Sequence, residues 1–199
     1  MKITVAITGA SGAVYGVTLL EYLLQEKHRV NLILSPEART IVQEELGYSW
    51  GGCFNETADI VKKRYPHSDL VYCNETDMTA PIASGSHLID AMVVAPCSMK
   101  AVAAIAHGFS GNLIERAADV TLKERRPLIL VPRETPLSTI HLKNMLTLSE
   151  MGAWLIPAMP AFYNRPKTID DMVLFIVGRV LDRLGIPNQS YTRWKEEPS

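Results

Sequence analysis

The polar residues most able to do chemistry come directly after apolar, strand-like runs of the chain. Three are serines that stand beside glycine or proline and lead into a helical pattern, and the fourth is an arginine. They are Ser11, Ser35, Ser98 and Arg133. Free backbone N–H groups at helix N-termini attract anions, and a guanidinium binds phosphate oxygens in pairs. If these four side chains meet on one rim, they would form a phosphate site.

Each serine also has a purely structural interpretation. Serine at a helix start is a common N-cap, which accepts a hydrogen bond from the helix backbone without any ligand. For any one of the three, capping alone is the more frequent role. Their shared position with Arg133 favours a ligand site instead.

The elements that must position these residues alternate along the chain. Apolar runs predict strands, and apolar residues at helical spacing predict the helices between them. The expected strands are 3–8, 30–34, 91–95, 127–131 and 154–156, and the expected helices are 13–27, 36–46, 98–107, 112–123, 138–151 and 168–184. The weakly patterned stretch 47–86 predicts one short helix and one short strand near 69–73.

This alternation predicts an α/β fold, with a flavodoxin-like or Rossmann-like parallel sheet and helices on both faces. We expect one domain over residues 1–199. Ligands of such sheets bind beyond the carboxyl ends of the strands, which is where the four polar residues fall.

Bulk composition narrows the classes of function. The chain has 199 residues, 47% of them hydrophobic and 21% charged, and a formal net charge of −1. We therefore expect no nucleic acid or anionic membrane as a partner, and no run of about 18 apolar residues predicts a membrane span. The N-terminus does not resemble a signal peptide. Three scattered cysteines predict neither a disulfide framework nor a zinc site, which favours a reducing compartment, the cytoplasm.

The turn after the first strand distinguishes among nucleotide ligands. A dinucleotide fingerprint that starts at Gly9 needs glycine at two positions where Ser11 and Val14 stand. The second strand ends at Ser35, without the acidic residue that holds an adenine ribose. A mononucleotide such as FMN, with one phosphate and a flat ring over the strand ends, fits better.

Two features near the C-terminus predict further contacts. Arg179 lies among apolar residues of the last predicted helix, so its guanidinium needs an anion or a carboxylate nearby. The tail 187–199 has no periodic core pattern, yet it contains Tyr191 and Trp194. We expect this tail to dock on the chain itself or on a neighbouring subunit.

Five segments resemble the UbiX-like flavin prenyltransferases, formerly called phenylacrylic acid decarboxylases. They are ITGASGAVYG at 7–16, SGS at 84–86, VVAPCSM at 93–99, NLIERAADVTLKERRPLILVPRETPLSTIHLKNM at 112–145 and PAMPAFY at 157–163. They span almost the whole chain, and the block 112–145 is too long for chance. The related flavin-dependent cysteine decarboxylases carry Pro-Ala-Ser-Ala-Asn where this chain has APCSM at 95–99, a difference that favours the prenyltransferase branch.

The resemblance implies substrates, a product and site residues. Reduced FMN would be bound as a substrate, dimethylallyl phosphate would donate the prenyl group, and prenylated FMN would serve a separate UbiD-like decarboxylase. The implied flavin contacts are Gly9, Ala10, Ser11, Ser35, Ser98, Met99, Lys100, Ala101 and Arg133; the implied prenyl-phosphate contacts are Tyr163 and Arg179; and the implied catalytic residues are Glu45, Arg116, Lys123 and Glu134. Because Glu44 adjoins Glu45, the register of that acid stays open. The resemblance also implies a homo-oligomer, a dodecamer with sites at subunit interfaces.

The implied reaction needs no protein nucleophile. Flavin N5 would attack the allylic carbon as phosphate leaves, and a bond from flavin C6 would close a fourth ring. Cationic side chains would stabilise the leaving charge without a metal, and Glu134 could donate a proton to it. Two alternatives stay open: a flavin-dependent decarboxylase of small phenylacrylic-type acids, with Arg179 and Lys123 holding the carboxylate, and a non-catalytic FMN-binding regulatory subunit.

Overall fold

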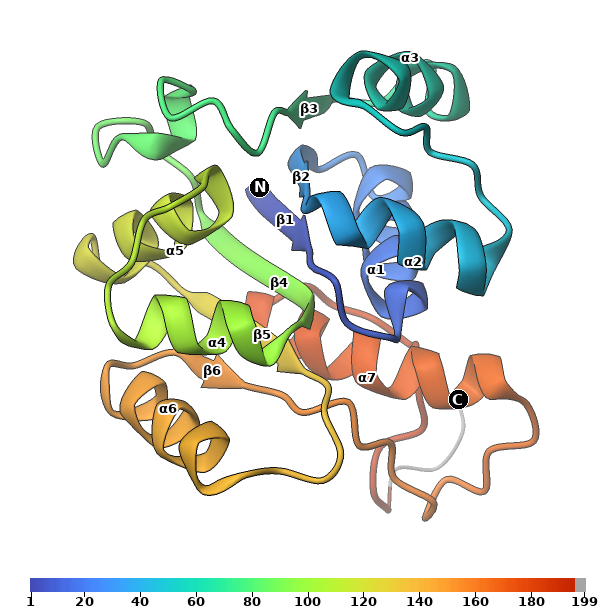
Figure 1. Ribbon diagram of the computed structural model, residues 1–199. Helices are drawn as coiled ribbons and strands as arrows, with labels where there is room; N and C mark the ends of the chain where they lie inside the picture. The colour runs from blue at the N-terminus through green and yellow to red at the C-terminus, as the bar shows by residue number, and fades with distance from the viewer. Residues whose placement is uncertain (196–199) are drawn as a thin grey trace.

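A parallel six-stranded sheet forms the centre of the molecule (Figure 1). The computed structural model describes residues 1–195, so the last four residues of the predicted domain and tail lie outside the described part. The strands are β1 (Lys2–Ile7), β2 (Arg29–Leu34), β3 (Leu70–Cys73), β4 (Ala91–Cys97), β5 (Leu128–Pro132) and β6 (Trp154–Leu155). Their order is β3-β2-β1-β4-β5-β6, and every neighbouring pair is parallel. This is the doubly wound order, and without the edge strand β3 it is the flavodoxin-like order.

Helices cover both faces of this sheet, as the sequence predicts (Figure 1). On one face lie α1 (Ala13–Gln25), α2 (Pro36–Leu46), α3 (Phe54–Arg64) and α7 (Ile169–Leu184). On the other lie α4 (Met99–Ala106), α5 (Leu113–Lys123) and α6 (Thr139–Glu150), with a short 3-10 helix η1 (Pro81–Ala83). Successive strand residues point to opposite faces, so Val5 contacts the first layer and Ala6 the second. The expected α/β class is therefore confirmed.

The predicted boundaries differ from the observed ones by two residues at most. Helix α1 ends at Gln25 rather than residue 27, and β4 continues to Cys97 rather than ending at residue 95. The weakly patterned stretch contains α3, β3 and η1. Nowhere in residues 1–195 is a helix both long and apolar enough to cross a membrane.

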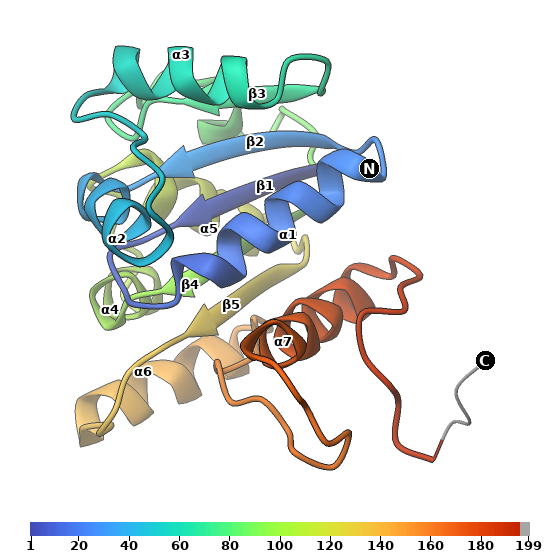
Figure 2. The same ribbon diagram turned by 90° about the vertical axis from the view of Figure 1, so that its right-hand side faces the viewer.

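The winding of the chain reverses between β1 and β4. From β1 the chain proceeds outward through β2 and β3, and it then crosses back to place β4 on the other side of β1. Figure 2 shows that the strand arrows point the same way, so all carboxyl ends lie at one edge. Gly16 lets α1 approach this junction, because a Cβ there would overlap the Ala95 carbonyl oxygen. A crevice at the carboxyl ends of β1 and β4 is the expected ligand site of such a sheet.

Candidate functional site

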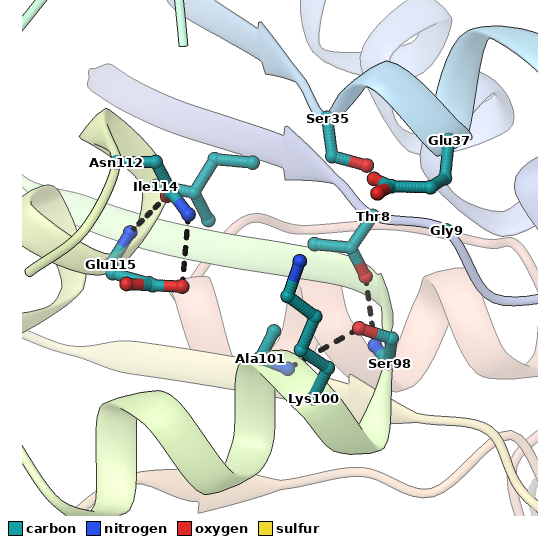
Figure 3. A pocket seen from close by; sticks show the side chains of 10 residues that line it. All are labelled: Thr8, Gly9, Ser35, Glu37, Ser98, Lys100, Ala101, Asn112, Ile114 and Glu115. Carbon is teal, nitrogen blue, oxygen red and sulfur yellow. Dashed lines mark hydrogen bonds between the residues drawn. The ribbon is translucent and has the colours of Figure 1, made fainter. Parts of the chain in front are cut away.

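A pocket of about 150 Å³ opens at this reversal point, beyond the ends of β1, β2 and β4 (Figure 3). It is lined by Thr8, Gly9, Ser35, Glu37, Ser98, Lys100, Ala101, Asn112, Ile114 and Glu115. Five of these are implied flavin contacts: Gly9, Ser35, Ser98, Lys100 and Ala101. The sheet thus gathers residues that are up to 92 positions apart, from Gly9 to Ala101, around one hollow.

Ser35 and Ser98 are both N-caps and pocket residues. The Ser35 hydroxyl accepts a hydrogen bond from the Ala38 N–H at 3.2 Å, and the Ser98 hydroxyl accepts one from Ala101 at 3.3 Å. Each hydroxyl keeps a second lone pair, so capping leaves it able to accept a hydrogen bond from a ligand. The capping interpretation is right for both, and it does not compete with the ligand interpretation.

Thr8 joins the ends of β1 and β4 beneath the pocket. Its buried hydroxyl donates to the Pro96 carbonyl at 2.8 Å and accepts from the Ser98 N–H at 2.7 Å. The two bonds fix the loop that presents Ser98 (Figure 3). Thr8 was not predicted as a site residue from the sequence, although a hydroxyl at the end of an apolar strand was a usable signal.

Replacing Thr8 with valine is expected to lower the free energy of unfolding by about 1–3 kcal/mol, because a buried hydrogen-bond partner is lost. FMN binding should weaken as well, since the Ser98 loop loses its anchor. Urea unfolding and an FMN titration would measure both effects. Thr147→Val is the matched control: that exposed hydroxyl bonds only within α6, to Lys143, and the change should stay within about 0.5 kcal/mol. A Thr8→Val protein with unchanged stability and FMN affinity would show that the two hydrogen bonds of the Thr8 hydroxyl are dispensable.

Arg133 and Ser11 meet beside the pocket. The Arg133 Nε donates to the Ser11 carbonyl at 3.1 Å, and the Arg133 backbone N–H donates to Cys97 at 3.3 Å. The loop after β5 is thereby tied to the loop after β1 and to the end of β4. Glu134 follows on the exposed side, with its carboxylate accepting from the Thr135 N–H at 2.9 Å.

Glu45 reaches the same rim from the end of α2. Its carboxylate accepts from the Gly12 N–H at 2.9 and 3.1 Å and from the Ala13 N–H at 2.9 Å. Gly12, at φ 101°, has no side chain to cap α1, so Glu45 supplies the cap from outside the helix. The structure therefore places Glu45, rather than Glu44, beside the first loop. A carboxylate at this helix N-terminus is electrostatically favourable.

Glu37, Lys100 and Glu115 are the charged residues that line the pocket. The Glu37 carboxylate accepts hydrogen bonds from the Glu37 backbone N–H and from the Ser35 hydroxyl, and Lys100 is nearby. These interactions hold the pKa of Glu37 below its usual value. Figure 3 shows the Lys100 side chain reaching into the hollow. Cys97 faces the core instead, and burial raises the pKa of its thiol to about 12, so it is no nucleophile at neutral pH. Ala10 and Met99 are buried.

Asn112 and Glu115 are pocket residues that the sequence analysis did not assign. Glu115 is only 8% exposed, and its carboxylate accepts from the Gly111 N–H and the Asn112 side chain, both at 2.8 Å. The Asn112 side chain in turn caps α5 by accepting from the Glu115 N–H. The Asn-x-x-Glu spacing predicts such a helix start, but it carries no signal for a ligand.

The implied catalytic residues Arg116 and Lys123 lie on α5 and are not among the residues that line this pocket, although Arg116 directly follows the pocket residue Glu115. Arg116 donates to the Ala83 carbonyl at 3.0 Å and to Asp119 at 2.9 Å, and Lys123 pairs with Glu124. Lys123 lines a separate depression of about 750 Å³. Lys123 comes before β5 in the chain, and Arg133 comes directly after it. The five residues of β5 span about 16 Å, so the two side chains belong to opposite ends of this strand.

The implied prenyl-phosphate contacts Tyr163 and Arg179 form a third group, with α7. The Tyr163 ring lies edge-on to Phe175 with centroids 6.0 Å apart, and the Arg179 guanidinium donates to the Tyr191 hydroxyl at 3.2 Å. Since α7 and α5 cover opposite faces, the sheet separates Arg179 from Lys123. Within one chain, the implied residues thus divide into a strand-end group (Ser11, Ser35, Ser98, Arg133 and Glu45), an α5 group (Arg116 and Lys123) and an α7 group (Tyr163 and Arg179).

A doubly wound sheet with a polar pocket at its reversal point is typical of nucleotide-binding proteins. The model of the Flavoprotein family matches residues 1–181, so the chain belongs to that family. Among curated relatives, "Flavin prenyltransferase UbiX" of Methanocaldococcus jannaschii is 50% identical over 194 residues, which cover 98% of each chain. The chain therefore belongs, more narrowly, to the UbiX flavin prenyltransferases, and the resemblance stated from the sequence is confirmed.

Two solved structures share the fold over the full length. One is a dodecameric FMN-dependent UbiX-like decarboxylase from Escherichia coli O157:H7, with a TM-score of 0.88, 46% identity, and coverage of 98% of this chain and 100% of that one. The other is AnUbiX (PadA1) in complex with FMN and dimethylallyl pyrophosphate, with a TM-score of 0.87, 41% identity, and coverage of 99% and 98%. The first name gives a decarboxylase, whereas the second gives a complex with FMN and a prenyl compound and states no activity.

Proposed function

We propose that this chain joins a dimethylallyl group from dimethylallyl phosphate to N5 and C6 of reduced FMN, releasing prenylated FMN. The observation that carries the proposal is the strand-end pocket, where five implied flavin contacts line one hollow and Arg133 closes on Ser11 beside it. Membership of the UbiX family and the complex of AnUbiX with FMN support this assignment.

The pocket covers only part of an FMN molecule. Pockets that enclose ligands of this size usually measure about 300–1,000 Å³, whereas this one holds about 150 Å³. Part of the flavin must therefore be covered by another surface. A neighbouring subunit is the natural source of that surface in a homo-oligomer.

The charged residues implied to bind the prenyl phosphate lie on opposite faces of the sheet, and this arrangement also favours a contribution from a neighbouring subunit. The resemblance implies that the α5 group and the α7 group contact the same prenyl phosphate, yet the sheet lies between them in one chain. We propose a homododecamer in which each site combines groups from different subunits, as the dodecameric relative suggests. The large apolar side chains of Ile140, Leu146, Met159 and Phe162, each more than half exposed, support extensive subunit contacts.

In the proposed reaction the protein orients substrates and stabilises charge. Reduced FMN supplies the two nucleophilic atoms. Arg116, Lys123 and Arg179 would neutralise the phosphate as its bond to carbon breaks. Glu134, exposed next to Arg133, would donate a proton to the leaving phosphate.

We further propose that the product serves a UbiD-like decarboxylase in the cytoplasm. The free thiols of Cys53, Cys73 and Cys97 support a reducing compartment. The test is reconstitution: a UbiD-like decarboxylase made in cells without a flavin prenyltransferase should gain activity only when this protein, FMN, a reductant and dimethylallyl phosphate are all supplied.

The same assay separates the alternatives. The name of the Escherichia coli relative favours direct decarboxylation as the second candidate. Carbon dioxide released from cinnamic acid by this protein alone would establish that candidate. A protein that binds FMN but neither prenylates it nor decarboxylates acids would be a regulatory subunit.

A further inference from the structure

The segment that follows α7 folds back along that helix. Figure 2 shows this red segment beside α7, on the opposite side of the molecule from the strand arrowheads. The described part of the tail consists of residues 187–195. Its side chains converge on Asp182: Asn188 donates to it at 3.0 Å, Tyr191 at 2.7 Å, and Arg193 at 2.6 and 3.1 Å. Gly178 makes room for the tail, because a Cβ there would lie 2.5 Å from the Tyr191 ring.

The Tyr191 hydroxyl connects this cluster to Arg179. It accepts a hydrogen bond from the Arg179 guanidinium at 3.2 Å and donates its own proton to Asp182. Its ring is held against Phe175 with centroids 5.0 Å apart. Arg179 therefore rests against a hydroxyl whose position is fixed on two sides.

Two guanidinium groups, those of Arg179 and Arg193, share the Asp182 carboxylate. Burial raises the pKa of Asp182, but hydrogen bonds from Arg193, Tyr191 and Asn188 outweigh it and hold the pKa below its usual value, so the carboxylate is ionised at neutral pH. Arg193 forms the bidentate pair with Asp182, and Arg179 stands 3.6 Å from it. The longer of the two ion pairs to Asp182 is that of Arg179, the residue implied to bind substrate.

The tail also touches the second residue of the α7 group. Trp194 lies edge-on to the Tyr163 ring with centroids 5.1 Å apart, and Tyr163 lies edge-on to Phe175 at 6.0 Å. A continuous row of rings thus runs from Trp194 through Tyr163 and Phe175 to Tyr191. Both implied prenyl-phosphate contacts are held by one short segment.

We propose that the tail is a positioning element for the prenyl-phosphate site. Tyr191 sets the direction of the Arg179 guanidinium, Arg193 takes the bidentate pair with Asp182 so that Asp182 holds Arg179 only through the longer contact of 3.6 Å, and Trp194 supports Tyr163. This inference rests on the proposed function and adds Tyr191 and Arg193 as positioning residues. Without either of them, Asp182 would draw Arg179 toward itself and compete with the substrate phosphate.

The experiment measures dimethylallyl phosphate binding to the full-length protein loaded with oxidised FMN, by calorimetry, so that no turnover occurs. Tyr191→Phe and Arg193→Gln should each weaken this binding about tenfold or more, the usual effect of losing a hydrogen bond to a charged group. FMN affinity should not change. In turnover assays the KM for dimethylallyl phosphate should rise much more than kcat falls, and Arg193→Lys, which keeps the charge, should recover part of the loss.

The matched control is Tyr22→Phe. The Tyr22 hydroxyl donates to the Pro187 carbonyl at 3.3 Å, so this change loosens the same tail without touching the Asp182 cluster, and it should leave prenyl-phosphate binding intact. If the parent protein binds dimethylallyl phosphate and Tyr191→Phe and Arg193→Gln bind it equally well, the tail does not position Arg179. If the parent itself does not bind it, the proposed function is wrong, and this inference is wrong with it.

Discussion

Replacing Lys123 with alanine is expected to slow prenyl transfer roughly a hundred- to thousand-fold, or about 2.7–4 kcal/mol in the barrier, the typical cost of losing one preorganised charge contact. FMN binding should remain, because Lys123 lines a depression at the edge where β5 begins and not the strand-end pocket. Single-turnover rates with saturating reduced FMN, together with an FMN titration, would measure the two effects separately.

The matched control for this change is Lys63→Ala. Lys63 is an exposed lysine in the last turn of α3, distant from all three groups of implied residues, and its loss should not change the rate. A Lys123→Ala protein that reacts as fast as the parent would remove Lys123 from the mechanism.

Mixing two inactive variants is expected to restore activity. Lys123→Ala and Arg179→Ala should each be inactive as homo-oligomers. If each site takes Lys123 from one subunit and Arg179 from another, random co-assembly in equal amounts leaves about a quarter of the sites intact. Co-expression with two affinity tags, purification through both, and a rate measurement would give this fraction.

The control mixture combines Lys123→Ala with Arg116→Ala. These two residues lie seven positions apart on α5, two turns along one helix face, and are expected to enter the same site from the same subunit. That mixture should stay inactive. If the Lys123→Ala and Arg179→Ala mixture is equally inactive, or if light scattering shows a fully active monomer, shared sites are the wrong interpretation.

Most of the fold was predictable because both faces of the sheet are covered. The central strands are buried on both sides, so they appear in the sequence as continuous apolar runs such as residues 3–7 and 91–95. The stretch 47–86 was hard to interpret for the opposite reason. Helix α3 buries only Thr57 and Val61, and β3 is a short edge strand with no fully buried residue, so neither leaves a strong periodic pattern.

Ser11, Ser35, Ser98 and Arg133 were predictable as a set because the rule for parallel sheets places residues after each strand on one edge. Glu45 lies at the end of α2, and only the family resemblance implied it. Other parts of the site depend on contacts that no local pattern records. The hydrogen bond that holds Arg179 is donated to Tyr191, in a tail without periodicity, and burial of Glu115 follows from how α5 meets the pocket. In the proposed shared sites, a meeting of Lys123 and Arg179 would depend on other subunits, which spacing within one chain does not encode.

The most direct test of the central claim is the mass of the flavin after reaction. The purified protein would be incubated anaerobically with reduced FMN, dimethylallyl phosphate and a chelator, and the extracted flavin analysed by mass spectrometry. The account predicts that the flavin gains the mass of one prenyl unit, that omission of the reductant abolishes the gain, and that the chelator does not. A flavin of unchanged mass in the complete mixture, from protein shown to bind FMN, would contradict the assignment of this chain as a flavin prenyltransferase.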